Sequence, residues 1–208
     1  MLEELKRRVI AVAVQAEKEG LCRHKSGNFS MKDAKTGYIV VTPTGIKRED
    51  LNEDAIIVVD SEGKVVENKS TYKPTSELPM HLVAYKTRPD ISAVVHTHAI
   101  FATVFAVQSK EIRPIVFEAF GYGGKLPIAK YGRPGTMDLA NSIIEPLGQS
   151  DACLLEKHGA LTVGNSIEDA FLKMQYVEDV AQIYFYSLLL GKEPSLVPQE
   201  EFDAIKHA

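Results

Sequence analysis

The chain of 208 residues has only two cysteines, no long run of basic residues and no long uninterrupted hydrophobic segment. Two cysteines, Cys22 and Cys153, are too few for a disulfide scaffold, so we expect a reducing, cytoplasmic location. No hydrophobic run approaches the roughly 20 residues of a membrane-spanning helix. The net charge of -4 gives no reason to expect a nucleic-acid partner. The sequence also lacks repeats, low-complexity tracts and linkers, which predicts one domain over residues 1–208.

The N-terminal segment carries charge before a short apolar stretch, as a secretion signal does, but its pattern is that of an amphipathic helix. Leucine, valine and alanine recur at helical spacing, and Glu3 and Glu4 stand where a signal would be basic. We therefore expect a helix that ends near Gly20.

The remaining periodicities predict alternating strands and helices. We expect strands in 37–46, 50–68, 91–100 and 152–164, with turns at 62–63 and 158–159. We expect helices over 75–89, 101–108, 137–148 and 166–191, with Thr75 or Ser76 capping the first and Ser166 capping the last. Residues 25–32 read as a turn, and residues 120–136, rich in Gly, Pro and Tyr, read largely as a loop.

Two of the six histidines stand one residue apart in the segment AVVHTHAIFATV, residues 93–104. Successive side chains on a strand point to opposite faces, so His96 and His98 would share a face at a backbone separation of roughly 7 Å. That spacing suits two imidazoles that bind one metal ion. It equally suits two histidines that line a polar pocket.

A catalytic zinc site typically has three protein ligands and an open position, so a third ligand is needed. His158 is the strongest candidate, because it precedes a glycine at a predicted strand end. The alternatives are His24 in a basic turn, His207 in the C-terminal tail, and His81. His81 follows Glu77 by four residues on the same predicted helix face, where it can support a ligand or simply pack.

Glu77 lies in the first turn of a predicted helix, where a carboxylate commonly does no more than favour the helix dipole. Beside a bound cation the same carboxylate could carry protons or fill the open coordination position until substrate arrives. Small polar turns offer N–H and hydroxyl groups for an anion, although each is also an ordinary turn or cap. These turns are Ser26, Gly27 and Asn28; Thr42, Pro43, Thr44 and Gly45; and Thr75 with Ser76.

The motifs SGNFS, VTPTGI, PTSELPMHLVAYKTRPD, AVVHTHAIFATV, YGRPGT and LLEKHGALTVG occur in this order along the chain. Together they resemble the class II aldolase/adducin family, and within it the bacterial L-fuculose-1-phosphate aldolases, from the first helix to the last. The resemblance implies an α/β fold, a three-layer α/β/α domain with a largely antiparallel central sheet. It also implies a homotetramer with active sites at the subunit interfaces.

By position in these motifs, His96, His98 and His158 match the family's metal-binding histidines. Glu77 matches the catalytic glutamate, which can also contact the metal. One divalent ion per subunit is implied, zinc before manganese or cobalt, because three imidazoles accept each of these ions. The family's phosphate-binding loops match Gly27, Asn28, Thr44, Gly45, Thr75 and Ser76.

The implied reaction is that of a metal-dependent aldehyde-lyase of carbohydrate metabolism. Its substrate, L-fuculose 1-phosphate or a 5-deoxypentulose 1-phosphate, is cleaved to dihydroxyacetone phosphate and an aldehyde. A divalent ion held by neutral imidazoles stabilises the enediolate, while Glu77 transfers the proton at the carbon that gains charge. The partner is then a small sugar phosphate, with no nucleic acid and no membrane.

Three other functions remain open. Sugar-phosphate 4-epimerases of the family carry aspartate where this chain has Glu77, which favours the aldolase. A methylthioribulose-1-phosphate dehydratase or aldolase would use the same residues, and a non-catalytic adducin-like assembly module would need none of them. The family tyrosine that assists at the aldehyde end is matched by Phe117, which would suit a methyl or thioether group. Its role would then pass to a neighbour such as Tyr122 or Tyr131, to water, or to no group at all.

Overall fold

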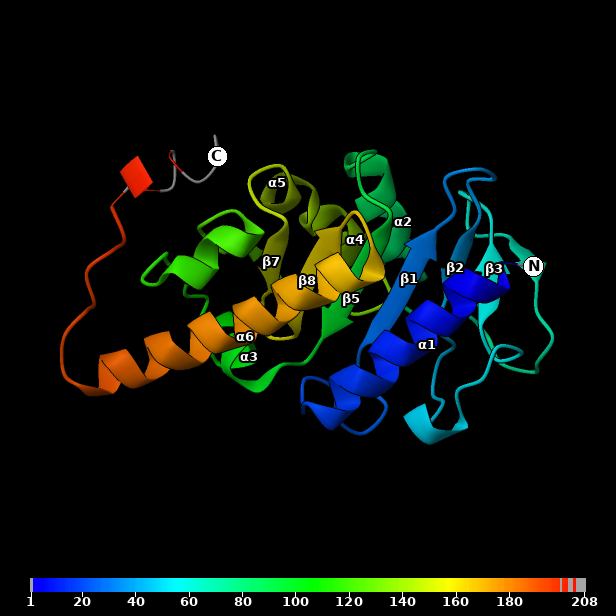
Figure 1. Cartoon of the computed structure of the whole chain (residues 1–208), viewed down its shortest axis with the longest axis horizontal. Helices are drawn as coiled ribbons and strands as arrows, with labels where there is room; N and C mark the ends of the chain where they lie inside the picture. Colours follow the sequence, from blue (N-terminus) through cyan, green and yellow to red (C-terminus); the bar gives the residue numbers. More distant parts are fainter. Residues whose placement is uncertain (1, 199, 202–203, 205–208) are drawn as a thin grey trace.

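The computed structural model describes residues 2–198, 200, 201 and 204. At its centre lies an eight-stranded sheet. Its strands are β1 (Asn28–Lys32), β2 (Ile39–Val41), β3 (Ile57–Val59), β4 (Val65–Glu67), β5 (Ala93–Thr97), β6 (Ile128–Ala129), β7 (Ala152–Leu155) and β8 (Gly159–Gly164). They lie in the order β4-β3-β2-β1-β5-β8-β7-β6 (Figure 1). All neighbours pair antiparallel except β6 and β7. The predicted largely antiparallel sheet is confirmed.

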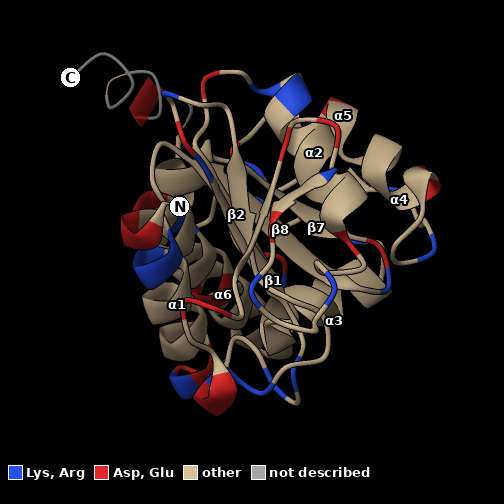
Figure 2. Ribbon diagram, turned by 90° about the vertical axis from the view of Figure 1, so that its right-hand side faces the viewer, with Lys and Arg blue, Asp and Glu red and all other residues tan. Residues whose placement is uncertain are grey.

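Helices cover both faces of this sheet and make the predicted three layers. One face of the sheet is covered by α1 (Glu3–Lys18), α3 (Ile100–Val107) and α6 (Ile167–Leu189), and we call it the α6 face. The opposite face is covered by α2 (Leu78–Thr87), α4 (Met137–Ser142) and α5 (Ile144–Leu147), and we call it the α2 face. Successive side chains of a strand point to opposite faces and so contribute to both core layers: Val95 packs on the α6 face and Val94 on the α2 face. Charged residues lie mainly on the helices and loops outside the sheet, with both signs interspersed (Figure 2).

Several local expectations are confirmed. The first helix ends at Lys18, close to the expected end near Gly20. Ser166 caps α6, because its hydroxyl accepts a 3.1 Å hydrogen bond from the Asp169 N–H. Pro79 lies in the first turn of α2, where its missing N–H costs little. Within the described residues, no helix has both the length and the apolar character needed to cross a membrane.

The turn predicted over residues 25–32 is wrong for its second half, which forms β1. The reason lies in the side chains of this strand. Phe29 and Met31 enter the core on the α6 face, whereas Asn28 and Ser30 are buried on the opposite face and find hydrogen-bond partners there. Small polar residues such as Asn28 and Ser30 are typical of turns, so this segment was predicted as a turn. The sequence does not reveal the buried hydrogen-bond partners that allow them to lie in a strand.

Other boundaries differ as well. β5 ends at Thr97, so His98 lies just beyond the strand. Glu77 takes the N-cap position of α2 without a side-chain capping bond, so neither Thr75 nor Ser76 is that cap. Two short helices replace the one predicted over 137–148, and the predicted loop at 120–136 contains β6 and the end of the 3-10 helix η2 (Phe117–Tyr122). A second short 3-10 helix, η1, spans Arg48–Asp50.

Candidate functional site

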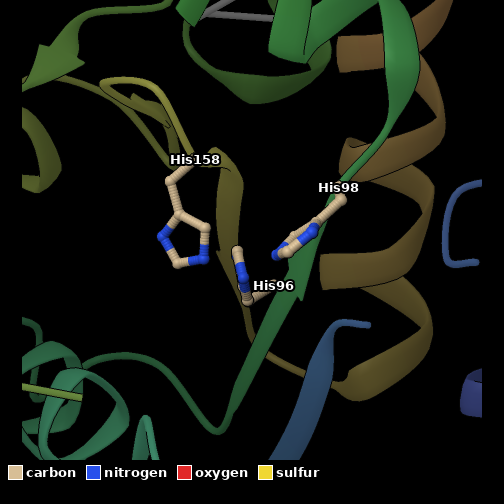
Figure 3. A group of neighbouring side chains, drawn as sticks. All are labelled: His96, His98 and His158. Carbon is tan, nitrogen blue, oxygen red and sulfur yellow. The ribbon is translucent and has the colours of Figure 1, made fainter. Parts of the chain in front are cut away.

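Three histidine rings converge at the end of β5 (Figure 3). His96 belongs to β5, His98 follows the strand, and His158 comes from the turn between β7 and β8. The ring centroids are 5.0 Å apart for His96 and His98, 4.7 Å for His96 and His158, and 4.9 Å for His98 and His158. One nitrogen from each ring lies within 4.8 Å of the others. The structure thus brings together the three histidines that the sequence analysis grouped.

The other candidates for the third position are placed elsewhere or are not described. His24 is exposed in a turn and has a positive φ of 52°. His81 is fully buried on α2, with both ring nitrogens hydrogen-bonded to other residues. His207 lies outside the described residues.

A glycine allows the β7–β8 turn to approach β5. A Cβ atom on Gly159 would lie 2.3 Å from the carbonyl oxygen of Thr97 and 3.3 Å from ring atoms of His96 and His98. Contacts of 2.3 Å are forbidden, so only glycine fits without a shift of the backbone. The sequence pair His158 and Gly159 therefore has a steric basis: the glycine makes room for the histidine cluster.

The carboxylate of Glu77 faces the same cluster. Its Oε2 lies 3.2 Å from His96 Nε2, and its Oε1 lies 3.4 Å from His158 Nε2. The residue is 6% exposed. Burial alone would raise the pKa of Glu77, but His96, Asn28 and His158 outweigh burial and hold this pKa well below that of an ordinary glutamate. Glu77 is therefore a carboxylate at neutral pH.

The donor atoms of this cluster fit a divalent metal ion. His96 Nδ1 lies 2.9 Å from the carbonyl oxygen of Ala160, which can only accept, so Nδ1 carries a proton and Nε2 is the nitrogen that faces the cluster. Among the described residues, His96 Nε2, Glu77 Oε1 and His158 Nδ1 are buried without a hydrogen-bond partner. Burial, reinforced by His96, lowers the pKa of His98 and of His158 to about 4, so both rings are neutral. Neutral imidazoles and a carboxylate are ligands that zinc-type ions accept.

A chain of hydrogen bonds leads away from Glu77 between β1 and α2. Asn28 Nδ2 donates to Glu77 Oε2 at 2.8 Å, and Asn28 Oδ1 lies 2.6 Å from His81 Nε2. His81 Nδ1 lies 2.7 Å from Ser30 Oγ, which lies 2.8 Å from the hydroxyl of Tyr85. Because the Asn28 oxygen can only accept, His81 donates from Nε2 and accepts from Ser30 at Nδ1. Each group orients the next.

Two matched periodicities build this chain. Asn28 and Ser30 are two apart on β1 and so share a face, while Glu77, His81 and Tyr85 recur every four residues along one side of α2. The sequence analysis left His81 open between support and packing and missed Ser30 and Tyr85. The regular spacing on α2 was a usable signal, but its partner strand was taken for a turn.

The three polar turns also lie together. The Thr75 N–H donates to the Thr42 carbonyl at 3.1 Å, and the Phe29 N–H donates to the Thr42 hydroxyl at 3.1 Å. The Thr75 hydroxyl in turn accepts from the Glu77 N–H at 3.3 Å. Thr75 is buried, whereas Thr44, Gly45 and Ser76 are exposed. Hydrogen bonds thus join segments from three parts of the chain beside Glu77.

The residues considered for the aldehyde end are now distinguished. Phe117 is 57% exposed at the start of η2, with its ring centroid 5.6 Å from that of Phe120. Tyr122 is fully buried in the core on the α6 face, and burial raises the pKa of its hydroxyl. Of the alternatives left open for the family tyrosine, Tyr122 is thereby excluded, because no substrate reaches a buried hydroxyl. Tyr131 is 58% exposed and lies beside Lys157, next to His158 in sequence.

Comparisons with known proteins agree with this geometry. Residues 7–185 match the family described as Class II Aldolase and Adducin N-terminal domain. The chain is 30% identical over 203 residues to the 5-deoxy-D-ribulose 1-phosphate aldolase of Bacillus thuringiensis serovar kurstaki, which covers 98% of this chain and 94% of that protein. It is 32% identical over 203 residues to the L-fuculose phosphate aldolase of Escherichia coli K12, over 97% and 92% of the two chains. A solved L-fuculose 1-phosphate aldolase superposes with a TM-score of 0.92 at 31% identity, over 97% of this chain and 93% of that one.

Proposed function

Because the chain belongs to the class II aldolase and adducin family, and its aldolase relatives are lyases, we propose that it cleaves a ketose 1-phosphate to dihydroxyacetone phosphate and an aldehyde. The substrate is a 5-deoxypentulose 1-phosphate or L-fuculose 1-phosphate, the classes that the relatives' names describe. The observation that carries this proposal is the buried carboxylate of Glu77, which faces both His96 and His158.

We assign the metal site to His96, His98 and His158, with Glu77 beside them. A divalent ion bound there, zinc before manganese or cobalt, supplies a Lewis acid for the oxygen atoms of the ketose. The protein's part is to present neutral rings with free lone pairs. The bond from His96 Nδ1 to Ala160 and the low pKa of the other two rings support that assignment.

Glu77 is the proton carrier of the proposed reaction. Cleavage breaks the bond between C3 and C4: the C4 hydroxyl loses its proton as the aldehyde forms, and C3 gains one as dihydroxyacetone phosphate forms. In cleavage the proton released by the C4 hydroxyl passes through water to the Glu77 carboxylate, which delivers it to C3. Condensation runs the same transfer in reverse, with Glu77 taking the proton from C3. Asn28 occupies Oε2, while Oε1 has no hydrogen-bond partner among the described residues. Oε1 is therefore the oxygen that we assign to proton transfer.

The polar turns are assigned to the substrate phosphate, which their N–H and hydroxyl groups would bind. The binding residues proposed are Gly27, Asn28, Thr44, Gly45, Thr75 and Ser76. The hydrogen bonds that join these turns beside Glu77 support the assignment. The homotetramer with active sites at subunit interfaces and the cytoplasmic location, both expected above, are retained as proposals.

The test is a cleavage screen of the purified protein with its metal content measured alongside. 5-Deoxy-D-ribulose 1-phosphate, L-fuculose 1-phosphate and methylthioribulose 1-phosphate are incubated with enzyme, and dihydroxyacetone phosphate is detected by its NADH-dependent reduction. We expect its release from at least one ketose, loss of activity with a chelator, and recovery with zinc, manganese or cobalt. A diketone product would show a dehydratase, and an epimeric sugar phosphate would show an epimerase. No turnover with any metal would favour an assembly module.

A further inference from the structure

Arg48 places a buried guanidinium directly behind one of the proposed phosphate turns. The residue is 3% exposed. Its Nη2 donates to the carbonyl oxygens of Ser26 at 2.6 Å and Gly27 at 2.8 Å, and its Cζ lies 5.4 Å from the ring centroid of Phe29. In the described part of the chain, its Nε has no hydrogen-bond partner and no carboxylate pairs with it.

This arrangement leaves most of the positive charge uncompensated. A buried charge without an ionic partner is costly, and two carbonyl oxygens offset only part of that cost. The proposed phosphate turns contain no lysine or arginine of their own. The uncompensated guanidinium therefore favours an anion on the far side of the turn.

Arg48 also sets the direction of two peptide groups. The carbonyl and the following N–H of a trans peptide point in opposite directions, so the N–H groups of Gly27 and Asn28 point away from Arg48. The Asn28 N–H faces β5, where Asn28 pairs with His96, so the Gly27 N–H is the one that can serve an anion. Gly27 has a φ of +77°, and a Cβ there would lie 2.5 Å from Cys22 Sγ and 2.7 Å from the His96 carbonyl oxygen. The turn is thus pressed against the strand that carries His96.

We propose that Arg48 is a positioning residue for the substrate phosphate. It orients the peptide group that carries the Gly27 N–H and supplies positive charge from behind the turn, acting through the carbonyls of Ser26 and Gly27 without touching the phosphate. This inference rests on the proposed function, because it takes the turn around Gly27 as the phosphate site.

The experiment compares Arg48→Met, Arg48→Lys and the control Lys47→Met in the metal-loaded enzyme. Lys47 is the exposed neighbour and pairs only with Glu49 among the described residues. Affinity for inorganic phosphate is measured by calorimetry, and kcat and KM are measured with the ketose 1-phosphate. For Arg48→Met we expect phosphate affinity to fall and KM to rise about tenfold, with kcat within about twofold. Arg48→Lys keeps the charge but loses the paired carbonyl bonds, so we expect partial recovery.

Other results overturn the proposal. Unchanged phosphate affinity in folded Arg48→Met would do so, as would a loss caused by Lys25→Met, since Lys25 is the exposed cation beside the same turn. A purely structural role would lower kcat, metal content and melting temperature together. If Arg48→Met does not fold, the phosphate affinity, kcat and KM of Arg48→Lys and Arg48→Gln test the proposal in its place. Phosphate binding needs no turnover, so wild-type protein that binds phosphate but cleaves no ketose refutes the aldolase and not the role of Arg48.

Discussion

The side-chain amide of Asn28 donates a 2.8 Å hydrogen bond to Oε2 of Glu77, although the two residues are 49 positions apart. The oxygen of the same amide accepts a hydrogen bond from His81 Nε2. This pair of contacts decides which carboxylate oxygen of Glu77 is engaged and which is left for chemistry. A buried asparagine on a strand thereby orients the proposed proton carrier at the start of a helix.

Removing this restraint should slow the reaction without removing the metal. In Asn28→Ala, Glu77 loses the bond that orients it, and we expect kcat at saturating substrate to fall by about 10- to 100-fold. Bound metal, measured by elemental analysis, should stay at the wild-type level. The control Asn141→Ala alters an exposed asparagine on α4 and should leave kcat unchanged. Full activity in Asn28→Ala would show that Glu77 is oriented by other contacts.

The proton-carrying role of Glu77 is tested by Glu77→Gln. The amide keeps the size of the side chain but cannot accept the proton, so kcat should fall by about 10²- to 10⁴-fold. Exchange of the C3 proton of dihydroxyacetone phosphate with deuterated water, followed by NMR, should fall in parallel. Glu62→Gln, at an exposed turn, serves as the control. Exchange at the wild-type rate in Glu77→Gln would mean that another group moves the proton.

The metal assignment is tested by His98→Ala. Loss of one of three imidazole ligands should reduce the bound metal to well below one ion per chain after dialysis and should abolish activity. The matched variant His24→Ala removes an exposed histidine outside the cluster and should retain full metal content. If His98→Ala keeps its ion as tightly as the wild type, the ligand set proposed here is wrong.

Acid should destabilise the metal-free protein through its buried histidines. Burial, with a smaller contribution from His96, lowers the pKa of His81 to about 3, whereas the unfolded chain takes up a proton below about 6.5. Between these values the unfolded state binds more protons. Stability therefore falls as pH drops from 6.5 towards 3, by about 1.4 kcal/mol per pH unit for one such group. His98 and His158 act in the same direction down to about pH 4.

Urea unfolding in the presence of a chelator, at about pH 6 and about pH 5, measures this slope. The slope of the unfolding free energy against pH reports how many more protons the unfolded state binds. In His81→Gln this number should fall by about one, because the variant lacks one of the three histidines that titrate. His24→Gln should retain the wild-type slope, since His24 is exposed. Identical slopes in wild type and His81→Gln would mean that His81 does not stay neutral in the folded state.

The amino-acid sequence indicated most of the helices and strands and grouped the three histidines, whereas the layer architecture was predicted from its resemblance to a known family. Helical and strand periodicities are local, so α1, α2, α6 and the β7–β8 hairpin could be predicted from neighbouring residues. His96, His98 and His158 were grouped by the combination of a short spacing, a His-Gly turn and a motif order that resembles a known family. The prediction of this cluster thus depended on which residue types occur at these positions.

Only the tertiary structure decided how Glu77 is held and what lies behind the proposed phosphate turn. The contacts of Asn28 with Glu77 and of Arg48 with Gly27 join segments that are distant in the sequence. Their strength comes from burial and direction, and the spacing of residues along one element does not show which segment it will contact. A buried polar strand face and an isolated arginine read as solvent-exposed positions until the packing shows what surrounds them.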